Sequence, residues 1–199
     1  MVKRIVFIFF FLATVFWGCY YLLFASSNTS IHFNASLFEN GDLILRKGRS
    51  LESFAVYLSD DESDFTHIGI VSKEQSKIYV IHITPSKNNL VKKEGLEDFL
   101  SDKNTSRFSL IRPKFDLNTL NSVVGQANLF FKKKYTFDNQ YDLKTDTELY
   151  CTELVYKAFL NAGITLDVKP SNFNYVLGNH NIIMPSGFTN SSSFKKIIY

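Results

Sequence analysis

The most helix-like stretch of the chain reads Tyr150-Cys-Thr-Glu-Leu-Val-Tyr-Lys-Ala-Phe-Leu-Asn-Ala-Gly163. Cys151 shares one face of this helix with Leu154 and Val155, and Gly163 is typical of a helix end. Cys151 stands at the helix start, where the positive end of the dipole and unpaired backbone N–H groups favour the thiolate, which is the nucleophilic form of cysteine. With a histidine to hold its proton, this thiol meets the requirements of a cysteine nucleophile.

Shorter segments before this helix predict a sheet with helices packed on it. Strands are expected at Asp42–Arg46, Thr66–Val71, Lys77–Ile83, Leu90–Lys92 and Phe108–Arg112, and helices at Leu51–Leu58, Gly95–Leu100 and Leu117–Lys132. The long helix should bury a stripe formed by Leu117, Leu120, Val124, Ala127 and Phe131. Tyr135–Thr147 and the residues from Pro170 onward are interpreted as loops with short elements. The pattern favours an α+β domain with a mixed or antiparallel sheet of about four to six strands.

Two histidines lie on consecutive predicted strands. If Ser72 pairs with Lys77 across a four-residue loop, His67 lies directly opposite His82, and both project from the same face of the sheet. The helix that begins with Cys151 can then bring its thiol to His67. His82 would orient His67 through the second ring nitrogen, as a third group does in catalytic triads. A register slip of one residue would send the two histidines to opposite faces.

The sequence leaves three interpretations of these residues open. In the first, Cys151 is a nucleophile; in the second, it is a small buried residue beside two hydrogen-bonded histidines. In the third, His67, His82 and Cys151 bind a metal ion. No fourth ligand stands at a suitable spacing, because His32 and His180 are distant in the sequence. We therefore predict neither a metal ion nor another cofactor.

An uncharged, apolar stretch runs from Ile5 to Ala25. About 20 helical residues span the hydrocarbon core of a bilayer, and Lys3 and Arg4 before the stretch favour a cytoplasmic N-terminus. We expect residues 1–25 to form a transmembrane signal anchor, residues 26–36 a linker, and residues 37–199 the functional domain. The protein would be a single-pass membrane protein with its domain outside the cytoplasm. A cleaved signal peptide is the alternative, although its apolar region is usually shorter.

Composition limits the classes of function. The chain has 199 residues and a formal charge of +3, which falls to +1 without Lys3 and Arg4. A near-neutral domain lacks a broad basic field, so we expect no nucleic-acid partner. Cys151 is the one cysteine outside the apolar stretch and has no partner for a disulfide within the domain. It is therefore either inert and buried or a reactive thiol.

Four motifs together resemble the YiiX-like branch of the NlpC superfamily, the circularly permuted papain-like cysteine hydrolases. They are Asn40-Gly-Asp-Leu-Ile-Leu-Arg46, Phe65-Thr-His-Ile-Gly-Ile-Val71, Val80-Ile-His-Ile-Thr-Pro85 and Tyr150-Cys-Thr-Glu-Leu-Val155, in the order of the family. In ordinary papain-like enzymes the cysteine precedes the histidine. Here His67 precedes Cys151, as a permuted chain requires.

The resemblance implies a permuted papain-like fold in which Cys151 is the nucleophile, His67 the base and His82 the orienting residue. A histidine at the third position is also similar to the lecithin–retinol acyltransferase-like branch of this fold. The expected substrates are amide bonds in peptides or cell-wall fragments, or acyl bonds in lipids, cleaved through an acyl-enzyme. A catalytically inactive domain that binds a lipid or a glycan is the alternative.

Two further residues are candidates for substrate binding. Tyr150 and Asp42 are expected to line the cleft beside Cys151, with a purely structural role as the alternative for each. For Asp42 that role would be to cap the adjacent turn. The backbone N–H of Cys151, at the start of its helix, is a candidate oxyanion donor.

Overall fold

The computed structural model describes residues 14–15, 17–18, 31–175 and 178–198, and only the backbone of residues 172–175 and 178–180. Its strands are β1 (Leu43–Gly48), β2 (His67–Glu74), β3 (Lys77–His82), β4 (Lys92–Gly95), β5 (Thr105–Pro113), β6 (Thr136–Phe137), β7 (Glu148–Leu149), β8 (Ser171–Tyr175), β9 (Gly178–Ile182) and β10 (Phe194–Ile198). Its helices are the short 3-10 turn η2 (Ala35–Leu37), α2 (Leu51–Ser59), α3 (Leu96–Phe99), α4 (Leu117–Lys132), α5 (Cys151–Asn161) and α6 (Pro185–Thr189).

One antiparallel sheet organises the described residues, with the strand order β10-β5-β1-β2-β3-β4. The first five strands of the chain coincide with or overlap the five predicted ones, so the α+β prediction with an antiparallel sheet is confirmed. The sequence did not predict β10, which pairs with β5 at one edge. Its Phe-Lys-Lys-Ile-Ile sequence lacks the alternation of apolar and polar residues that marks a half-buried strand.

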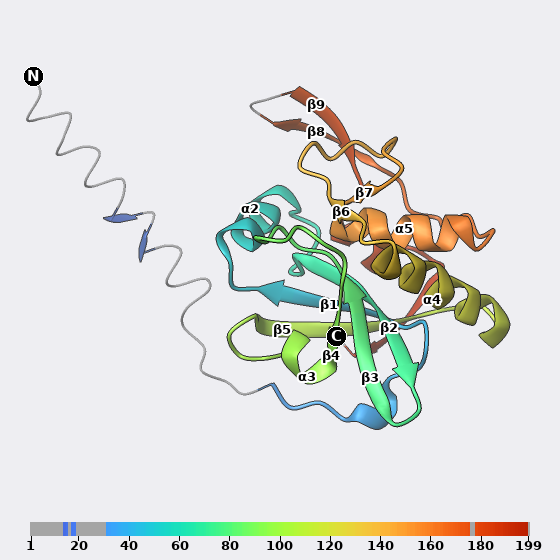
Figure 1. Cartoon of the computed structure of the whole chain (residues 1–199). Coiled ribbons are helices and arrows are strands. Elements are labelled where there is room, and N and C mark those ends of the chain that lie inside the picture. The colour runs from blue at the N-terminus through green and yellow to red at the C-terminus, as the bar shows by residue number, and fades with distance from the viewer. Residues whose placement is uncertain (1–13, 16, 19–30, 176–177, 199) are drawn as a thin grey trace, which may run out of the picture.

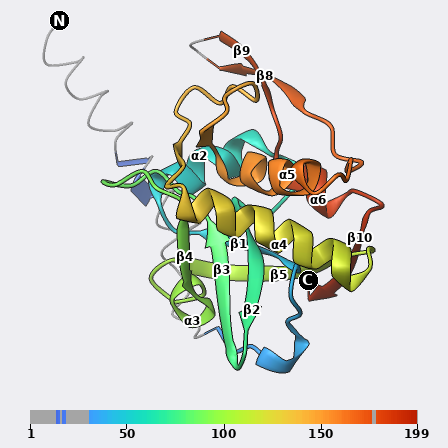
Figure 2. The same ribbon diagram turned by 45° about the vertical axis from the view of Figure 1, so that its right-hand side comes forward.

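Helices cover the two faces of this sheet unequally. The larger apolar cluster lies between one face and helices α4 and α5, which pack side by side (Figures 1 and 2). The smaller cluster lies on the other face, where α3 and the segment before β1 contribute Leu96, Phe99 and Phe38. Neighbouring residues of one strand enter different clusters, as with Leu43 and Ile44 of β1. This is the period of two that a strand buried on both faces requires.

Helix α4 has the predicted bounds but a different buried stripe. Leu117 is 65% exposed and Phe131 38% exposed, whereas Val123 and Phe130 are buried. The buried face is therefore rotated by about one residue from the stripe expected. At the C-terminal end Phe130 and Phe131 compete for the same face, and only packing against the rest of the fold selects Phe130.

The hairpin of β2 and β3 turns more tightly than predicted. Glu74 pairs with Lys77 around a two-residue turn, in which Gln75 has a φ of 53°. The prediction paired Ser72 with Lys77, but in the structure Ser72 pairs with Tyr79. The register is therefore shifted by two residues from the one expected.

This shift preserves the side-chain face because it is even. The observed register places Gly69 opposite His82, so that His67 and His82 are diagonal neighbours on one face rather than direct partners. A Cβ on Gly69 would lie only 3.1 Å from Cβ of His82 and 2.5 Å from a methyl group of Val80. Because glycine has no side chain, position 69 leaves room for the side chain of His82 on the neighbouring strand.

The predicted transmembrane helix is not seen among the described residues. The stretch from Ile5 to Ala25 lies almost entirely outside the described residues. Among the residues that are described, no helix has both the length and the apolar character needed to cross a bilayer. We therefore correct the predicted fold class to an α+β domain without that helix.

Candidate active site

A cavity of about 850 Å³ opens at one end of the main sheet. Its walls come from α2, the start of α5, the segments 139–141 and 182–185, and the ends of β1 to β4. Four of the five predicted site residues line it, namely Cys151, His67, His82 and Tyr150. Asp42 is absent from the lining. The structure thus brings the proposed nucleophile and both histidines to one solvent-accessible hollow.

Cys151 is the first residue of α5 and is half-buried. Burial raises the pKa of its thiol to about 11, although backbone N–H groups of Ile68, Thr152 and Cys151 itself act in the opposite direction. Sequence reasoning expected a lowered pKa from the helix start. The structure gives the opposite direction because desolvation outweighs the dipole and these N–H groups. The thiol therefore needs a base to remove its proton near neutral pH.

His67 and His82 form a buried, hydrogen-bonded pair. Nε2 of His67 lies 2.9 Å from Nδ1 of His82, and the two rings meet edge to face. The ring of Phe99 contacts both, with centroid distances of 5.8 Å and 5.1 Å. Burial, followed by the charge of Arg46, lowers the pKa of His67 well below 6.5. Neutral His67 is the form able to accept a proton.

The thiol and the histidines approach the cavity from different sides of the sheet. Cys151 packs against the cluster beneath α4 and α5. His67 and His82 instead contact Phe99, which belongs to the cluster on the other face. Helix α5 packs against β2, so its first turn reaches the end of that strand, where His67 begins it. Both residues therefore line the cavity at the end of the sheet rather than on a common face.

Sequence reasoning missed two charged residues beside the histidines. Oε1 of Glu94 lies 3.0 Å from Nε2 of His82, although the N–H bond is not aimed directly at it. Arg46 is 8% exposed, lies opposite His67 on β1, and donates to the carbonyl of Phe99 at 2.6 Å. Glu94 stands in a charged Lys-Lys-Glu run and Arg46 ends a predicted strand. Neither sequence pattern indicates a functional site by itself. Only the pairing of the strands shows that these two residues lie beside the histidines.

Arg46 is also in an unusual environment for a cation. Its guanidinium stacks over the ring of Phe99 at 4.2 Å and lies 4.0 Å from Glu94. Its Nε has no hydrogen-bond partner among the described residues. Burial lowers the pKa of Arg46 to about 10, so it keeps its positive charge at neutral pH.

The residues around Cys151 are held by a dense set of hydrogen bonds. The backbone N–H of Tyr150 donates to Glu153 at 3.1 Å, which caps the start of α5. The hydroxyl of Tyr150 accepts from the N–H of Ile183 at 3.1 Å, and Thr152 donates to the carbonyl of Ile183 at 2.6 Å. Tyr150 is only 2% exposed. Tyr150 therefore lines the cavity and also anchors the segment 182–185, which forms another part of its wall.

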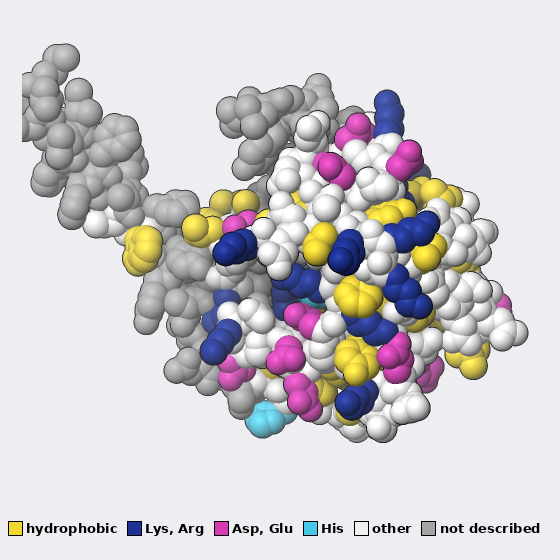
Figure 3. Space-filling model, in the orientation of Figure 1, with side chains coloured by type: hydrophobic (Ala, Val, Ile, Leu, Met, Phe, Trp, Pro, Cys, Tyr) yellow, Lys and Arg dark blue, Asp and Glu magenta, His cyan; other side chains and the backbone are white. Residues whose placement is uncertain are grey.

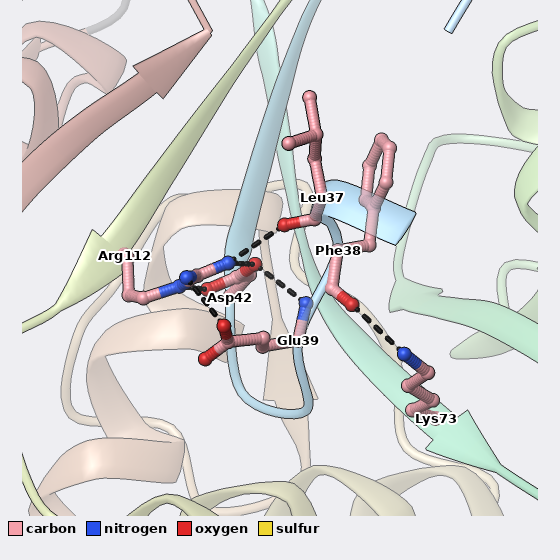
Figure 4. Close-up of polar contacts among 6 residues, drawn as sticks. All are labelled: Leu37, Phe38, Glu39, Asp42, Lys73 and Arg112. Atoms are coloured by element: carbon pink, nitrogen blue, oxygen red, sulfur yellow. Dashed lines mark hydrogen bonds and ion pairs between the residues drawn. The ribbon is translucent and has the colours of Figure 1, made fainter. Parts of the chain in front are cut away.

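Asp42 lies outside the lining of the cavity that the sequence predicted it to line. Figure 4 shows its carboxylate between Arg112 and the turn that precedes β1. Arg112 donates to both carboxylate oxygens at 2.8 Å and 2.9 Å, and the N–H of Glu39 donates at 2.8 Å. Asp42 has no exposed surface. Turn capping, the alternative that the sequence left open, is the arrangement found.

Basic and acidic side chains are intermingled on the face of the domain drawn in Figure 3, without an extended basic surface in that view.

Within the part of the chain that the structure describes, no three His, Cys, Asp or Glu side chains are grouped so as to hold a metal ion.

The fold and the site define a class of protein. An antiparallel sheet, a helix that begins with a cysteine and packs on that sheet, and a histidine pair earlier in the chain are the arrangement of a papain-like protein in permuted order. The family model described as "Permuted papain-like amidase enzyme, YaeF/YiiX, C92 family" matches residues 38–197. The chain therefore belongs to this family of permuted papain-like amidases.

Comparison with solved structures agrees with this fold. The chain is similar to the crystal structure of the metalloprotein YiiX from Escherichia coli O157:H7, with a TM-score of 0.66 and 18% identity. The match covers 80% of this chain and 96% of that one. No curated protein matches the chain at a significant level.

Proposed function

We propose that this protein is a cysteine hydrolase that cleaves an amide or acyl bond through an acyl-enzyme on Cys151. The observation that carries the proposal is one cavity lined by Cys151 and by a hydrogen-bonded histidine pair. Membership of an amidase family favours amides among the possible substrates. The second candidate substrate is an acyl bond of a lipid. His82 hydrogen-bonds His67 and so occupies the third position of the site. A histidine at that position is similar to the lecithin–retinol acyltransferase-like branch of this fold, which supports the lipid candidate.

In the proposed reaction the Cys151 thiol gives its proton to Nδ1 of His67 as its sulfur approaches the substrate, so that proton transfer and attack are one step. The sulfur attacks the substrate carbonyl, and the backbone N–H of Cys151 is the candidate donor to the resulting oxyanion. Collapse of this intermediate breaks the bond to the leaving amine or alcohol, which takes the proton from His67. Water then gives a proton to His67 and attacks the thioester, which releases the acid and restores the thiol.

The raised pKa of Cys151 and the lowered pKa of His67 support this order of events. Both groups are neutral in the resting site near pH 7, so proton transfer accompanies attack instead of preceding it. A base of low pKa is a weak acceptor by itself. Once His67 has accepted the proton, its positive charge must be stabilised through Nε2, the ring nitrogen that contacts His82.

Acylation by p-nitrophenyl acetate tests the proposal. We expect a burst of p-nitrophenolate and one acetyl group on Cys151 by peptide mass spectrometry. Cys151→Ser should remove the burst and the label, and His67→Gln should slow both. Cys19→Ser, which removes the other cysteine of the chain, is the matched control and should retain the burst.

A binding domain without activity predicts a different result. In that case wild type and Cys151→Ser would release p-nitrophenolate equally slowly, and neither would carry an acetyl group at position 151. Hydrolysis of N-acyl amino acid amides compared with lipid esters of the same acyl chain would then separate the two substrate candidates.

A further inference from the structure

Four adjacent strands place polar side chains beside the cavity. Arg46 of β1, His67 of β2, His82 of β3 and Glu94 of β4 all line it. Arg46 lies directly opposite His67, and Val80, two residues before His82, lies opposite Glu94. The contacts run in sequence along this row, from His67 to His82 at 2.9 Å and from His82 to Glu94 at 3.0 Å.

The charge of Glu94 determines what its neighbour can do. Burial acts to raise the pKa of this carboxyl, but the contact with His82 and the charge of Arg46 outweigh it, and the net pKa is lowered. Glu94 is therefore a carboxylate, which only accepts hydrogen bonds. Nε2 of His82 lies 3.0 Å away, and although its N–H is not aimed directly at the oxygen, the contact is favourable only when the hydrogen is on Nε2.

The position of the hydrogen on His82 in turn determines the position of the hydrogen on His67. Burial lowers the pKa of His82, so the ring is neutral and carries a single N–H. With its hydrogen on Nε2, Nδ1 of His82 can only accept. The 2.9 Å contact then requires a hydrogen on Nε2 of His67, which leaves Nδ1 of His67 without one. This bare nitrogen is the one that the proposed reaction uses as its base.

We infer that Glu94 is a positioning residue that fixes the tautomers of His82 and His67, so that Nδ1 of His67 is free to accept the proton of Cys151. The inference rests on the proposed function for its consequence in catalysis. Without the carboxylate, His82 is free to carry its hydrogen on Nδ1 and donate to His67. The hydrogen of His67 would then occupy Nδ1, and the base would be blocked.

Glu94 also acts through its charge. Arg46 and Lys92 both disfavour protonation of His67, and both line the same cavity. A carboxylate at the end of the row offsets these two cations when His67 becomes positive. A pair of imidazoles alone, as sequence reasoning assumed, lacks this compensation.

Two variants separate the two effects of Glu94. Glu94→Gln keeps an oxygen that can accept from His82 but removes the charge, whereas Glu94→Leu removes both. Glu97→Gln is the matched control, because Glu97 is an exposed glutamate of the adjoining helix and lies outside the cavity lining. Thermal melting of each variant first establishes that it folds. If the Leu variant does not, the Gln variant carries the test.

The first measurement is the tautomer state of both histidines in the free protein, by two-bond ¹H–¹⁵N spectra. Wild type should show hydrogen on Nε2 of both rings, and Glu94→Leu should show loss of this single state. The second is the acylation rate with p-nitrophenyl acetate. We expect a fall of about tenfold for Glu94→Gln and about 100-fold for Glu94→Leu, with KM unchanged. Glu97→Gln should match wild type in both.

Unchanged tautomers and unchanged acylation in folded Glu94 variants would overturn the inference while leaving the proposed function intact. Absence of acylation in wild type would instead overturn the proposed function. The spectra would still decide the role of Glu94, because they need no turnover. Hydrogen on Nδ1 of His67 in wild type would refute the inference directly.

Discussion

Two clusters of polar side chains are each built around buried groups, one of His67 and His82 with Glu94, the other of Asp42 with Arg112 and Glu39. Arg112 satisfies Asp42 with two hydrogen bonds, and the N–H of Glu39 adds a third. His67, His82 and Glu94 instead line a cavity that Cys151 also lines. Sequence reasoning assigned residues of both clusters to the site.

The two clusters differ in whether a side-chain atom remains available to react with a substrate. Every polar contact of Asp42 is made within the protein, so the carboxylate has nothing left to offer a substrate. The hydrogen bond between the histidines and the contact with Glu94 use both nitrogens of His82 but only one nitrogen of His67. A buried polar cluster thus indicates function when it adjoins a cavity and keeps a reactive atom, whereas a closed cluster indicates stability.

The sharpest way to break this comparison is to remove the reactive atom. His67→Gln should lower the acylation rate with p-nitrophenyl acetate by about 10²–10⁴-fold, the usual contribution of a general base. The melting temperature should change little. His32→Gln, at an exposed histidine outside the cavity lining, is the control. Equal rates for the two variants would remove His67 from the mechanism.

Asp42→Ala should show the reverse behaviour. The substitution removes the two hydrogen bonds from Arg112 and the one from the N–H of Glu39, and we expect the free energy of unfolding to fall by about 3 kcal/mol, measured by urea denaturation. The folded fraction should retain its acylation rate. Asp64→Ala breaks the exposed ion pair with Arg107, in which both side chains are about half exposed, and should cost less than about 1 kcal/mol. A loss of acylation in folded Asp42→Ala would return this residue to the site.

The pH dependence of alkylation tests the state of the thiol. A rise in pKa from 9.0 to about 11 reduces the thiolate fraction of Cys151 about 100-fold near neutral pH. Labelling by iodoacetamide should therefore be slower than for a small thiol at neutral pH and should keep rising beyond pH 9.0. A plateau already reached near pH 6.5, where a free histidine titrates, would instead reveal a preformed ion pair with His67.

A methyl group placed beside His82 tests how tightly its position is set. Gly69→Ala puts a Cβ 2.5 Å from Val80 and 3.1 Å from Cβ of His82. We expect a loss of about 1–3 kcal/mol in unfolding free energy and slower acylation. Gly125→Ala is the control, since nothing lies within 4 Å of its new Cβ, and should stabilise α4 by up to about 1 kcal/mol. Wild-type stability in Gly69→Ala would show that the hairpin adjusts freely.

The smallest effect concerns stability at acid pH. The pKa values of His67 and His82 are lowered in the fold, so the unfolded chain binds protons first as pH falls through 6.5. Stability is complete above pH 6.5 and declines below it, by at most about 1.4 kcal/mol per pH unit for each histidine. Urea denaturation from about pH 7 to about pH 5 should show this slope, and His82→Gln should reduce it. An unchanged slope would mean that His82 is not buried in its neutral form.

Sequence patterns located the main elements because those elements depend on local periodicity. Helices α4 and α5 and strands β1 to β3 have apolar residues at regular spacing, and Gly163 ends α5 with a φ of 83°. The pairing of His67 with His82 was predicted even though the register was wrong by two residues. An even error leaves the face of a strand unchanged, so the conclusion survived it.

Glu94, Arg46 and β10 were not predictable in this way, because their roles depend on neighbours far away in the chain. Glu94 meets His82 only after β4 has paired with β3. The pKa of Cys151 likewise depends on burial by other segments, which the helix start alone does not reveal.

The amino-acid order alone established a cysteine at a helix start, two histidines on one strand face, and their permuted sequence along the chain, because helix and strand periods are local properties. The folded chain decided that the thiol is neutral, that Asp42 serves a turn, and that Glu94 completes the histidine row. Each of these depends on desolvation and on contacts between distant segments, which exist only after the sheet and helices have packed.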